Sequence, residues 1–596
     1  MTSSFIHPAL ILIFGALILP FIRDPFRKIY LVTVPILTFL DVIYLNMHPG
    51  MHGVVSFMND WTLTFGRVDN LSMVFGFIMA LMAIIGTIYG LHVNDNWQHM
   101  AAWFYVAGSI GVIYCGDYLV LFLFWEMMAF ASTFLVWFNK EKGALAAGYR
   151  YLLVHTFGGV LLLLGFVLRY QVTGDLSFVH LSEQNSQLYT WLILAGLMLN
   201  AAVPPLHSWL PDAYSKATVT GAVFMCAFTT KTAIYTLARA FAGFDILIVL
   251  GVIMAIYGIV YAIMENDIRR LLGWEIVSQV GYMVTGVGIG TALAINGTCA
   301  HAFAHILYKG LLFMAAGAVV QATGKTKLTE LGGLYKKMPS TLVFMVVGGI
   351  SVSAFPFFSG FVTKSMIVTA SFEAHLLPVG FLLTLVSVGT FLVAGLRLPY
   401  YVFFGESRCD AATFNRAEDP PWNMHLAMLI SALLCFFIGS YTPFLYNMLP
   451  NPEVAYHPYG SYHLSETLQL LAFTGVAFYF LKELIAPRAT ISLDLDWFYR
   501  IGGRGFLWLA TYPIQWFDNV WGVIYRVVGL NCLMSSAKFW SWFDWHGIDG
   551  VVDGSARCVR ALGRRVTLVL QKGQIQQTLY VTVTFAAILL ASFVLL

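Results

Sequence analysis

The sequence has little charge for its length. Only 11% of its 596 residues are Asp, Glu, Lys or Arg, whereas 59% are hydrophobic. A soluble globular protein carries about twice that share of charge, so the composition excludes a water-soluble fold. The net charge of only +3 supplies no basic surface, so we expect no nucleic-acid partner.

The sequence also lacks the motifs of cofactor and nucleotide sites. Its seven cysteines are scattered, with no CxxC pair and no cluster with histidine, so neither an iron–sulfur cluster nor a zinc site is expected. No Gly-rich nucleotide-binding motif opens a helix. We therefore expect no cofactor and no resident metal, and an enzymatic role only as the proton-translocating part of a larger translocase.

Long hydrophobic runs, in contrast, recur from one end of the chain to the other. A helix needs about 20 mostly apolar residues to cross the bilayer core. Such runs begin near Pro8, Tyr30, Leu71, Ala101, Tyr118, Ala147, Leu188, Val219, Ile246, Leu272, Ala292, Thr341, Leu377, His425, Glu466 and Leu579. The sequence thus predicts an all-α polytopic membrane protein with about 16 transmembrane helices.

Basic residues alternate between the loops. Arg23 and Arg27 follow the first run, Arg269 and Arg270 follow the ninth, and the intervening loops are poor in Lys and Arg. Because Lys and Arg favour cytoplasmic loops, the pattern predicts a multi-pass protein with its N- and C-termini on the outer, periplasmic side. The first run lacks a basic segment and a cleavage site, so we expect a retained helix in a bacterial inner (plasma) membrane.

Composition divides the chain into five segments. They are N-terminal transmembrane helices at 1–100, a core at 101–405, additional transmembrane helices at 406–486, a less apolar segment at 487–577 and a final transmembrane helix at 578–596. The segment 487–577 interleaves Trp with Arg, a composition typical of the membrane–water interface. It predicts a lateral amphipathic helical segment, with an ordinary solvated cytoplasmic domain as the alternative.

Two runs in the core are interrupted by proline, at 199–205 and 353–360. Proline removes a backbone hydrogen bond, which the membrane tolerates only where protein or water replaces that bond. Paired broken helices are the best sequence indication of a transporter's ion path. The stretch around Glu126 is also loosely repeated around Glu275, which indicates an internal repeat.

Single charges lie inside apolar runs at Glu126, Lys231 and Lys364. A charge at the bilayer centre costs at least about 2.5–3.5 kcal/mol, so each is a candidate for proton transfer. The structural alternatives are a protonated or ion-paired acid for Glu126, a snorkelling side chain for Lys231 and a helix-end anchor for Lys364.

His301, His305 and Lys309 are spaced by four residues. On a helix each step turns about 400° and rises about 6 Å, so the three side chains form a ladder of titratable groups on one face. A proton relay is the favoured interpretation, because a metal site built on the two histidines lacks a third ligand.

Four further titratable residues are weaker candidates: Glu275, His155, Asp117 and Asp267. Glu275 and His155 lie in apolar surroundings and join the candidate relay. Asp267 precedes Arg269 and Arg270, so a loop ion pair explains it at least as well as a role in transport.

These residues and their neighbours resemble the antiporter-like, proton-conducting subunits shared by Mrp-type Na⁺/H⁺ antiporters, respiratory complex I and membrane-bound hydrogenases. The matching stretches are 125–128, 205–213, 267–272, 278–282, 301–313 and 359–364. The resemblance covers about residues 101–405. The tail resembles the lateral helix and final span of the largest such subunits.

The resemblance implies two inverted five-helix repeats, at about 101–243 and 244–405, each with a broken helix. Carried over by position, it implies that Glu126 is the acid of the fifth helix, Lys231 the lysine of the eighth, His301, His305 and Lys309 the central relay, and Lys364 the terminal lysine. One departure stands out. The family usually has a lysine where this chain has Asn200, which leaves Glu126 without its usual partner unless Lys231 replaces it.

The favoured function is a subunit of an Mrp-type monovalent cation (Na⁺)/proton antiporter. Its partners would be other subunits of a membrane complex, protons, Na⁺ as the candidate exchanged cation, and bilayer lipid. The alternatives are the proton-pumping membrane arm of a redox complex (NADH:quinone oxidoreductase or hydrogenase type), an energy-coupling subunit for inorganic carbon uptake, and a scaffold with a vestigial channel.

Overall fold

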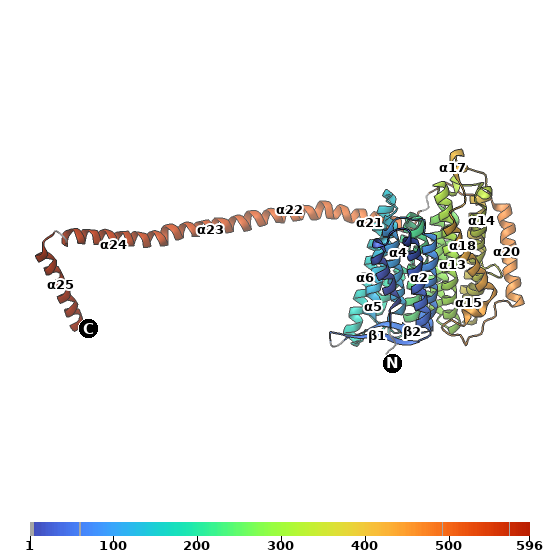
Figure 1. Ribbon diagram of the computed structural model, residues 1–596, viewed down its shortest axis with the longest axis horizontal. Coiled ribbons are helices and arrows are strands. Elements are labelled where there is room, and N and C mark those ends of the chain that lie inside the picture. Colours follow the sequence, from blue (N-terminus) through green and yellow to red (C-terminus); the bar gives the residue numbers. More distant parts are fainter. Residues whose placement is uncertain (1–4, 59–60, 491–492, 571–572, 596) are drawn as a thin grey trace. The chain divides into compact units, whose positions relative to one another are not determined.

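The computed structural model describes residues 5–58, 61–490, 493–570 and 573–595. Leu596, at which the last expected span ends, lies outside these described residues. The chain divides into two units, Met1–Asp496 and Trp497–Leu596. In the first unit the long helices run side by side (Figure 1).

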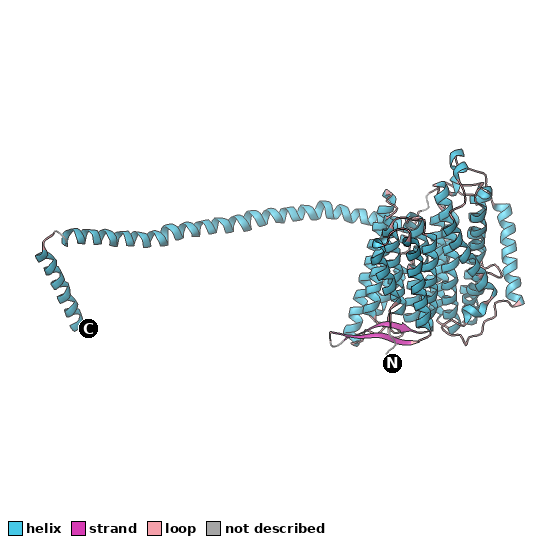
Figure 2. Cartoon of the chain, in the orientation of Figure 1, coloured by secondary structure: helices cyan, strands magenta, loops and turns pink. Residues whose placement is uncertain are grey.

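The first unit begins with three helices and a β-hairpin. The elements are α1 (Pro8–Ile18), η1 (Leu19–Phe21), α2 (Phe26–Asn46), β1 (Gly50–Phe57), β2 (Trp61–Val68) and α3 (Asn70–Tyr89). The two strands are antiparallel, with Gly50 opposite Val68 and Phe57 opposite Trp61, and they lie across the ends of the helices (Figure 2). The all-α expectation is therefore wrong at this hairpin, because residues 61–65 alternate polar and apolar side chains and fit a half-buried strand.

The core continues with helices from both of its halves. The first half contains α4 (Asn96–Tyr114), α5 (Tyr118–Trp137), α6 (Lys142–Thr173), α7 (Leu188–Asn200), α8 (Trp209–Lys216), α9 (Val219–Ala227) and α10 (Thr229–Ala240). The second half contains α11 (Asp245–Met264), α12 (Ile268–Ile289), α13 (Ala292–Thr323), η2 (Leu328–Glu330), η3 (Leu334–Lys336), α14 (Pro339–Val352), α15 (Ser359–Glu373), α16 (Leu377–Thr390), η4 (Phe391–Arg397) and η5 (Tyr400–Phe404). Each predicted apolar run begins at a helix start or within its first two turns.

Helices break where the prolines predict. α7 ends four residues before Pro204, and α14 ends four residues before Pro356. A left-handed residue follows each end, Ala202 with φ 59° and Ala354 with φ 60°. A third interruption at Phe228 separates α9 from α10. Each break leaves carbonyl groups without their helical partners in the middle of the bundle.

The rest of the chain adds the outer helices and the second unit. The first unit ends with α17 (Ala411–Arg416), α18 (Trp422–Ser440), α19 (Thr442–Tyr446) and α20 (Ser461–Leu481). The second unit consists of α21 (Asp496–Leu509), η6 (Ala510–Ile514), α22 (Gln515–Ile524), η7 (Tyr525–Leu530), α23 (Asn531–Phe543), η8 (Asp544–Ile548), α24 (Asp549–Leu570) and α25 (Ile575–Val594).

Eleven helices in the described part of the chain are long and apolar enough to cross a membrane. The expected number of sixteen stays a prediction, because α1 with η1, α7 and α14 are shorter and the broken helices divide their spans. One of the eleven is the continuous helix Asp496–Val569 of 74 residues. At 1.5 Å per residue it is about 110 Å long, which far exceeds the bilayer core.

Glycines bring the backbones of α11 and α12 into direct contact. A Cβ atom on Gly281 would lie 2.5 Å from the backbone nitrogen of Ala255, and one on Gly258 would lie 2.4 Å from that of Ser278. Backbone atoms cannot move aside as a flexible side chain can. The helix pair that carries Glu275 therefore depends on these two glycines.

We expect Gly281→Ala to destabilise the chain by about 1–3 kcal/mol, the usual cost of overpacking. Thermal unfolding of the detergent-solubilised protein measures the loss. Gly475→Ala is the matched control, because no atom lies within 4 Å of a Cβ at that position. Equal melting temperatures for the two variants would contradict the close approach of α11 and α12.

Candidate functional site

The centre of the first unit is α13, which carries the predicted ladder. The side chains of His301, His305 and Lys309 are all fully buried, and the two imidazole centroids lie 6.2 Å apart. His301 Nδ1 lies 3.4 Å from the hydroxyl of Thr363, and the Tyr308 hydroxyl lies 3.5 Å from His301 Nε2. Hydroxyl groups of Thr363 and Tyr308 thus lie beside His301, the first residue of the ladder.

Lys309 forms an ion pair with Glu275, which was one of the weaker candidates. Its Nζ atom lies 2.7 Å from Glu275 Oε2, and both side chains are fully buried. A buried charge without a partner is strongly destabilising, so each of these two residues requires the other. The structure therefore connects Glu275 on α12 to Lys309, the last residue of the ladder on α13.

Lys231 and Lys364 occupy matching positions at two broken helices. Lys231 donates to the carbonyl of Cys226 at 2.6 Å, at the end of α9. Lys364 donates to the carbonyl of Val352 at 3.0 Å, at the end of α14. The C-terminal end of a helix carries partial negative charge, so a helix end stabilises each ammonium group through a direct hydrogen bond.

Three lysines lie near His305. The charges of Lys231, Lys309 and Lys364 all lie within electrostatic range of this imidazole. Neither ring nitrogen of His305 has a hydrogen-bond partner among the described residues. His305 is therefore a fully buried imidazole within electrostatic range of three lysines.

The structure does not bring Glu126 into contact with Lys231. The carboxylate of Glu126 is half-buried on α5 and lies against Gly159 of α6. Its Oε1 atom has no hydrogen-bond partner among the described residues. Leu123 and Phe130, one turn away on either side, are exposed, so Glu126 lies near the outer surface of this chain.

His155 lies beside Asn200, the residue that replaces the usual lysine. The two side chains are within electrostatic range, yet neither ring nitrogen nor the amide group is hydrogen-bonded in the part of the chain that the structure describes. Aromatic rings hold the imidazole, with the Tyr151 centroid at 4.1 Å and the Trp209 centroid at 4.5 Å.

Asp117 and Asp267 cap helices. Asp117 accepts hydrogen bonds from the first amides of α5, and Asp267 accepts them from Arg269 and Arg270 at the start of α12. The side chain of Arg270 pairs with Glu265 instead. Both aspartates thus serve the local structure of their helices, as N-cap residues commonly do.

Sequence reasoning missed a buried contact between His207 and Asp494. His207 Nε2 lies 3.2 Å from Asp494 Oδ1, and the side chains are 0% and 2% exposed. The Tyr257 hydroxyl donates to the same oxygen at 2.6 Å. His207 belongs to a stretch singled out above, but nothing local in the sequence connects it to an acid 287 residues away.

Asp494 stays ionised in this environment. Burial alone would raise the pKa of its carboxyl group, but the hydrogen bonds from His207 and Tyr257 and the charge of His207 outweigh burial and hold that pKa below its usual value. A residue just before the second unit is therefore fixed to the broken-helix region of the core.

Comparisons with known proteins identify relatives of this arrangement. The family described as "NADH:quinone oxidoreductase/Mrp antiporter, TM" matches residues 115–393. The D-type subunit of the Na⁺/H⁺ antiporter of Alkalihalophilus pseudofirmus is 30% identical over 404 residues, which cover 61% of this chain and 79% of that protein. The A-type subunit from the same organism is 30% identical over 405 residues, or 60% of this chain, and the chain spans 50% of its length.

Other likenesses are to a hydrogenase component and to chains of two solved membrane complexes. Hydrogenase-4 component B of Escherichia coli is 27% identical over 418 residues, which cover 63% of this chain and 62% of that protein. A chain of the Mrp complex from Dietzia sp. DQ12-45-1b matches with a TM-score of 0.67 at 20% identity, covering 78% of this chain and 98% of that one. A chain of an archaeal membrane-bound sulfane sulfur reductase matches with a TM-score of 0.66 at 23% identity, covering 78% and 97%. These two structures show the fold alone.

We expect Asp494→Asn to loosen the segment around residue 494, because it leaves His207 buried without its anionic partner at a cost of about 3–5 kcal/mol. Hydrogen exchange of peptides from this segment measures the effect. Since the native pKa of Asp494 is lowered, its ionised carboxylate contributes to the stability of the folded segment at neutral pH. This contribution is lost as the pH falls through that pKa.

Acidified wild-type protein should therefore match the neutral variant, after correction for intrinsic exchange rates. Asp518→Asn, at an exposed position of α22, is the control. Unchanged exchange in Asp494→Asn would contradict a stabilising role for the buried pair.

Proposed function

Because the chain belongs to the transmembrane family shared by NADH:quinone oxidoreductase and Mrp antiporters, we propose that it carries protons through the bilayer as one antiporter-like subunit of a multisubunit complex. The observation that carries this proposal is the buried file from Lys231 through the α13 ladder to Lys364. Its members are bases, and Glu275 is the acid that pairs with one of them. An intramembrane series of titratable groups is typical of proton transport.

The relay works by exchanging partners. A lysine held by a helix-end carbonyl loses its proton more easily than one held by a carboxylate. His301 and His305 between the lysines belong to the residue type that changes charge near neutral pH in water, and they supply intermediate positions. When one lysine releases its proton, the like charge on its neighbours decreases and the next transfer becomes easier.

The core consists of two inverted repeats, at about 101–243 and 244–405. Several matched features support this proposal. α6 and α13 are both 32 residues long, and both end at a glycine with a φ of 68°, Gly174 and Gly324. Asp117 bridges to Ser177 as Asp267 bridges to Lys327, and a broken helix follows in each half.

Other subunits of the complex cover the surface around Glu126. This acid lies among exposed apolar side chains of α5, and a carboxylate facing lipid is costly.

The second unit also exposes surface that a partner or lipid would cover. Almost all of its residues are exposed, and α21, α22 and α24 are strongly amphipathic. Residues 487–577 therefore form a lateral segment at the interface of membrane and water, packed on neighbouring subunits or lipid.

We place the chain in a bacterial inner membrane, with both termini on the outer side and about 16 spans. The final helix at 578–596 then returns the chain across the bilayer. The exchanged cation is Na⁺ in the Mrp-type assignment, which the similarity to A-type and D-type antiporter subunits favours. The likeness to hydrogenase-4 component B supports the second candidate, a proton-pumping subunit that a redox partner drives.

We expect Lys231→Ala and Glu126→Ala to abolish coupled transport in the intact complex while the complex still assembles. Lys231→Ala removes the first titratable group of the buried file, and Glu126→Ala removes the acid that we propose faces a neighbouring subunit. Proton uptake into vesicles containing the complex measures transport. Lys327→Ala, which removes a half-exposed lysine in a loop, is the control, and full transport in both test variants would contradict the relay.

The two candidate functions predict different partners. Affinity purification of the tagged chain from its native membrane, followed by mass spectrometry, separates them. Small hydrophobic antiporter subunits without cofactor proteins would establish the cation/proton antiporter. Flavin, iron–sulfur or nickel subunits would establish the redox pump and overturn the antiporter assignment.

A further inference from the structure

The helix that carries Lys231 is unusually polar for a buried element. All twelve residues of α10 are buried, although they include Lys231, Arg239 and four threonines. Two hydroxyls of α4 face this helix. Tyr105 lies 2.6 Å from the Thr229 hydroxyl, and Ser109 lies 2.5 Å from that of Thr232. A polar file therefore runs along α10 and away from the bilayer centre.

Lys231, Tyr235 and Arg239 are spaced by four residues and share one face of α10. Arg239 thus lies about 12 Å from Lys231 along the helix axis, at 1.5 Å per residue. It lies toward the end of the first unit at which the β-hairpin is found, which we call the hairpin end. Without an obstacle, this face would lead from Lys231 to water.

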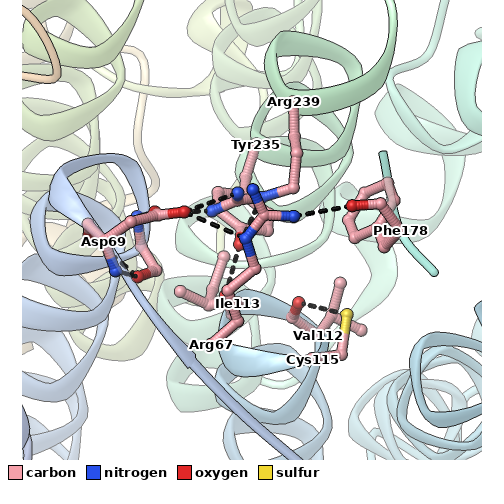
Figure 3. Close-up of polar contacts among 9 residues, drawn as sticks. Arg67, Asp69, Val112, Ile113, Cys115, Phe178, Tyr235 and Arg239 are labelled. Atoms are coloured by element: carbon pink, nitrogen blue, oxygen red, sulfur yellow. Dashed lines mark hydrogen bonds and ion pairs between the residues drawn. The ribbon is translucent and has the colours of Figure 1, made fainter. Parts of the chain in front are cut away.

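An ion cluster stands at the hairpin end of this face (Figure 3). Arg239 binds Asp69 through two contacts of 2.7 Å. Arg67 reaches the same carboxylate at 3.1 Å, and it also donates to the carbonyl of Phe178 at 2.6 Å. The side chain of Arg239 is 5% exposed, whereas those of Arg67 and Asp69 are 27% and 36% exposed. The cluster thus joins a buried charge to the surface.

Proton transfer stops at this cluster. The Tyr235 hydroxyl accepts a hydrogen bond from Arg239 Nε at 2.9 Å and donates its only proton to the carbonyl of Ile113. It therefore has no free proton to hand on. A guanidinium group does not deprotonate in proteins, so Arg239 cannot pass a proton either.

The cluster also keeps a net positive charge. Burial raises the pKa of Asp69, but its hydrogen bonds and charge contacts with Arg239, the amide of Ser72 and the charge of Arg67 together lower that pKa to about 2. The carboxylate is therefore ionised at neutral pH and balances only one of the two arginines. A fixed positive charge at a narrow point repels hydronium and metal cations, as it does in channels that exclude protons.

We propose that Arg67, Asp69 and Arg239 form a seal that closes the Lys231 half of the proton path at the hairpin end. Protons then reach and leave Lys231 only through the α13 ladder or from the opposite side of the membrane. This inference rests on the proposed function, because a seal matters only if the chain carries protons through the bilayer.

The test is passive proton flux through the purified complex reconstituted in liposomes, with no driving substrate. A pH jump is applied, valinomycin and K⁺ clamp the potential, and an internal pH dye reports the flux. We expect Arg239→Gln to raise the flux about tenfold or more, since each 1.36 kcal/mol of lost barrier speeds a rate tenfold. Arg239→Lys keeps the charge and should keep the flux close to that of the wild type.

A matched control lies beside the same hairpin. Like Arg239, Arg169 is almost fully buried, with a side chain that is 6% exposed, and it pairs with an aspartate, Asp175, at 3.0 Å. Within the described residues, however, this pair forms no hydrogen bond or ion pair with α10. Arg169→Gln should therefore leave the passive flux unchanged. A similar rise in both Gln variants would show general loosening of this end and overturn the seal.

Arg67→Gln is the second variant, because its partly exposed side chain tolerates substitution even if Arg239→Gln fails to assemble. It removes the excess positive charge and should raise the flux by a smaller factor. If the assembled Arg67→Gln complex shows wild-type flux, and Arg239→Gln does so where it assembles, the cluster has only a structural role. That result would overturn the seal.

The double variant Lys231→Ala/Arg239→Gln separates the seal from the proposed function. If Lys231 passes the leaking protons, the double variant returns to wild-type flux. A leak that persists without Lys231 would retain the seal and remove Lys231 from the proton path.

Discussion

Burying charge in an apolar bundle is the constraint on which the rest of the structure depends. An ammonium group at the bilayer centre is stable only if the protein supplies the negative potential that water would supply. The chain does so in two ways, with a carboxylate for Lys309 and with helix-end carbonyls for Lys231 and Lys364. The helix breaks are therefore the features that allow lysines to exist at these positions.

The two ways of holding a lysine have different consequences. A carbonyl dipole stabilises an ammonium group less than a carboxylate at a similar distance does. Lys309 and Glu275 balance each other, and His305 lies within electrostatic range of Lys309 and of the two outer lysines. Movement of one proton shifts the balance for its neighbours, because the water-poor interior screens charge weakly.

The parts of the site that follow from local spacing could be predicted from the sequence. His301, His305 and Lys309 lie on one helix, and the two proline-interrupted runs became broken helices, because helix geometry and proline chemistry are local. Contacts between distant segments could not be predicted. Glu275 pairs with a lysine 34 residues away, and His207 meets an acid from the far end of the first unit. The strands Gly50–Phe57 and Trp61–Val68 could not be predicted, because alternation over eight residues is a weaker signal than an apolar run of about 20.

The first half of the core differs from the second in where its charges are balanced. The second half contains its own acid–base pair, whereas the first half has Asn200 at the usual lysine position, an acid near the surface at Glu126 and an arginine cluster at the hairpin end. Asp494 contacts this half at the end opposite the hairpin. Its segment accepts hydrogen bonds from Tyr257 and Tyr261, and both tyrosines lie in the part of α11 remote from the hairpin end. The first half thus carries an arginine cluster at one end and is fixed through His207 to the segment before the second unit at the other. The buried Arg239 and His207 of the first half pair with carboxylates at its two ends, Asp69 and Asp494, whereas the second half pairs Glu275 with Lys309 in the buried interior.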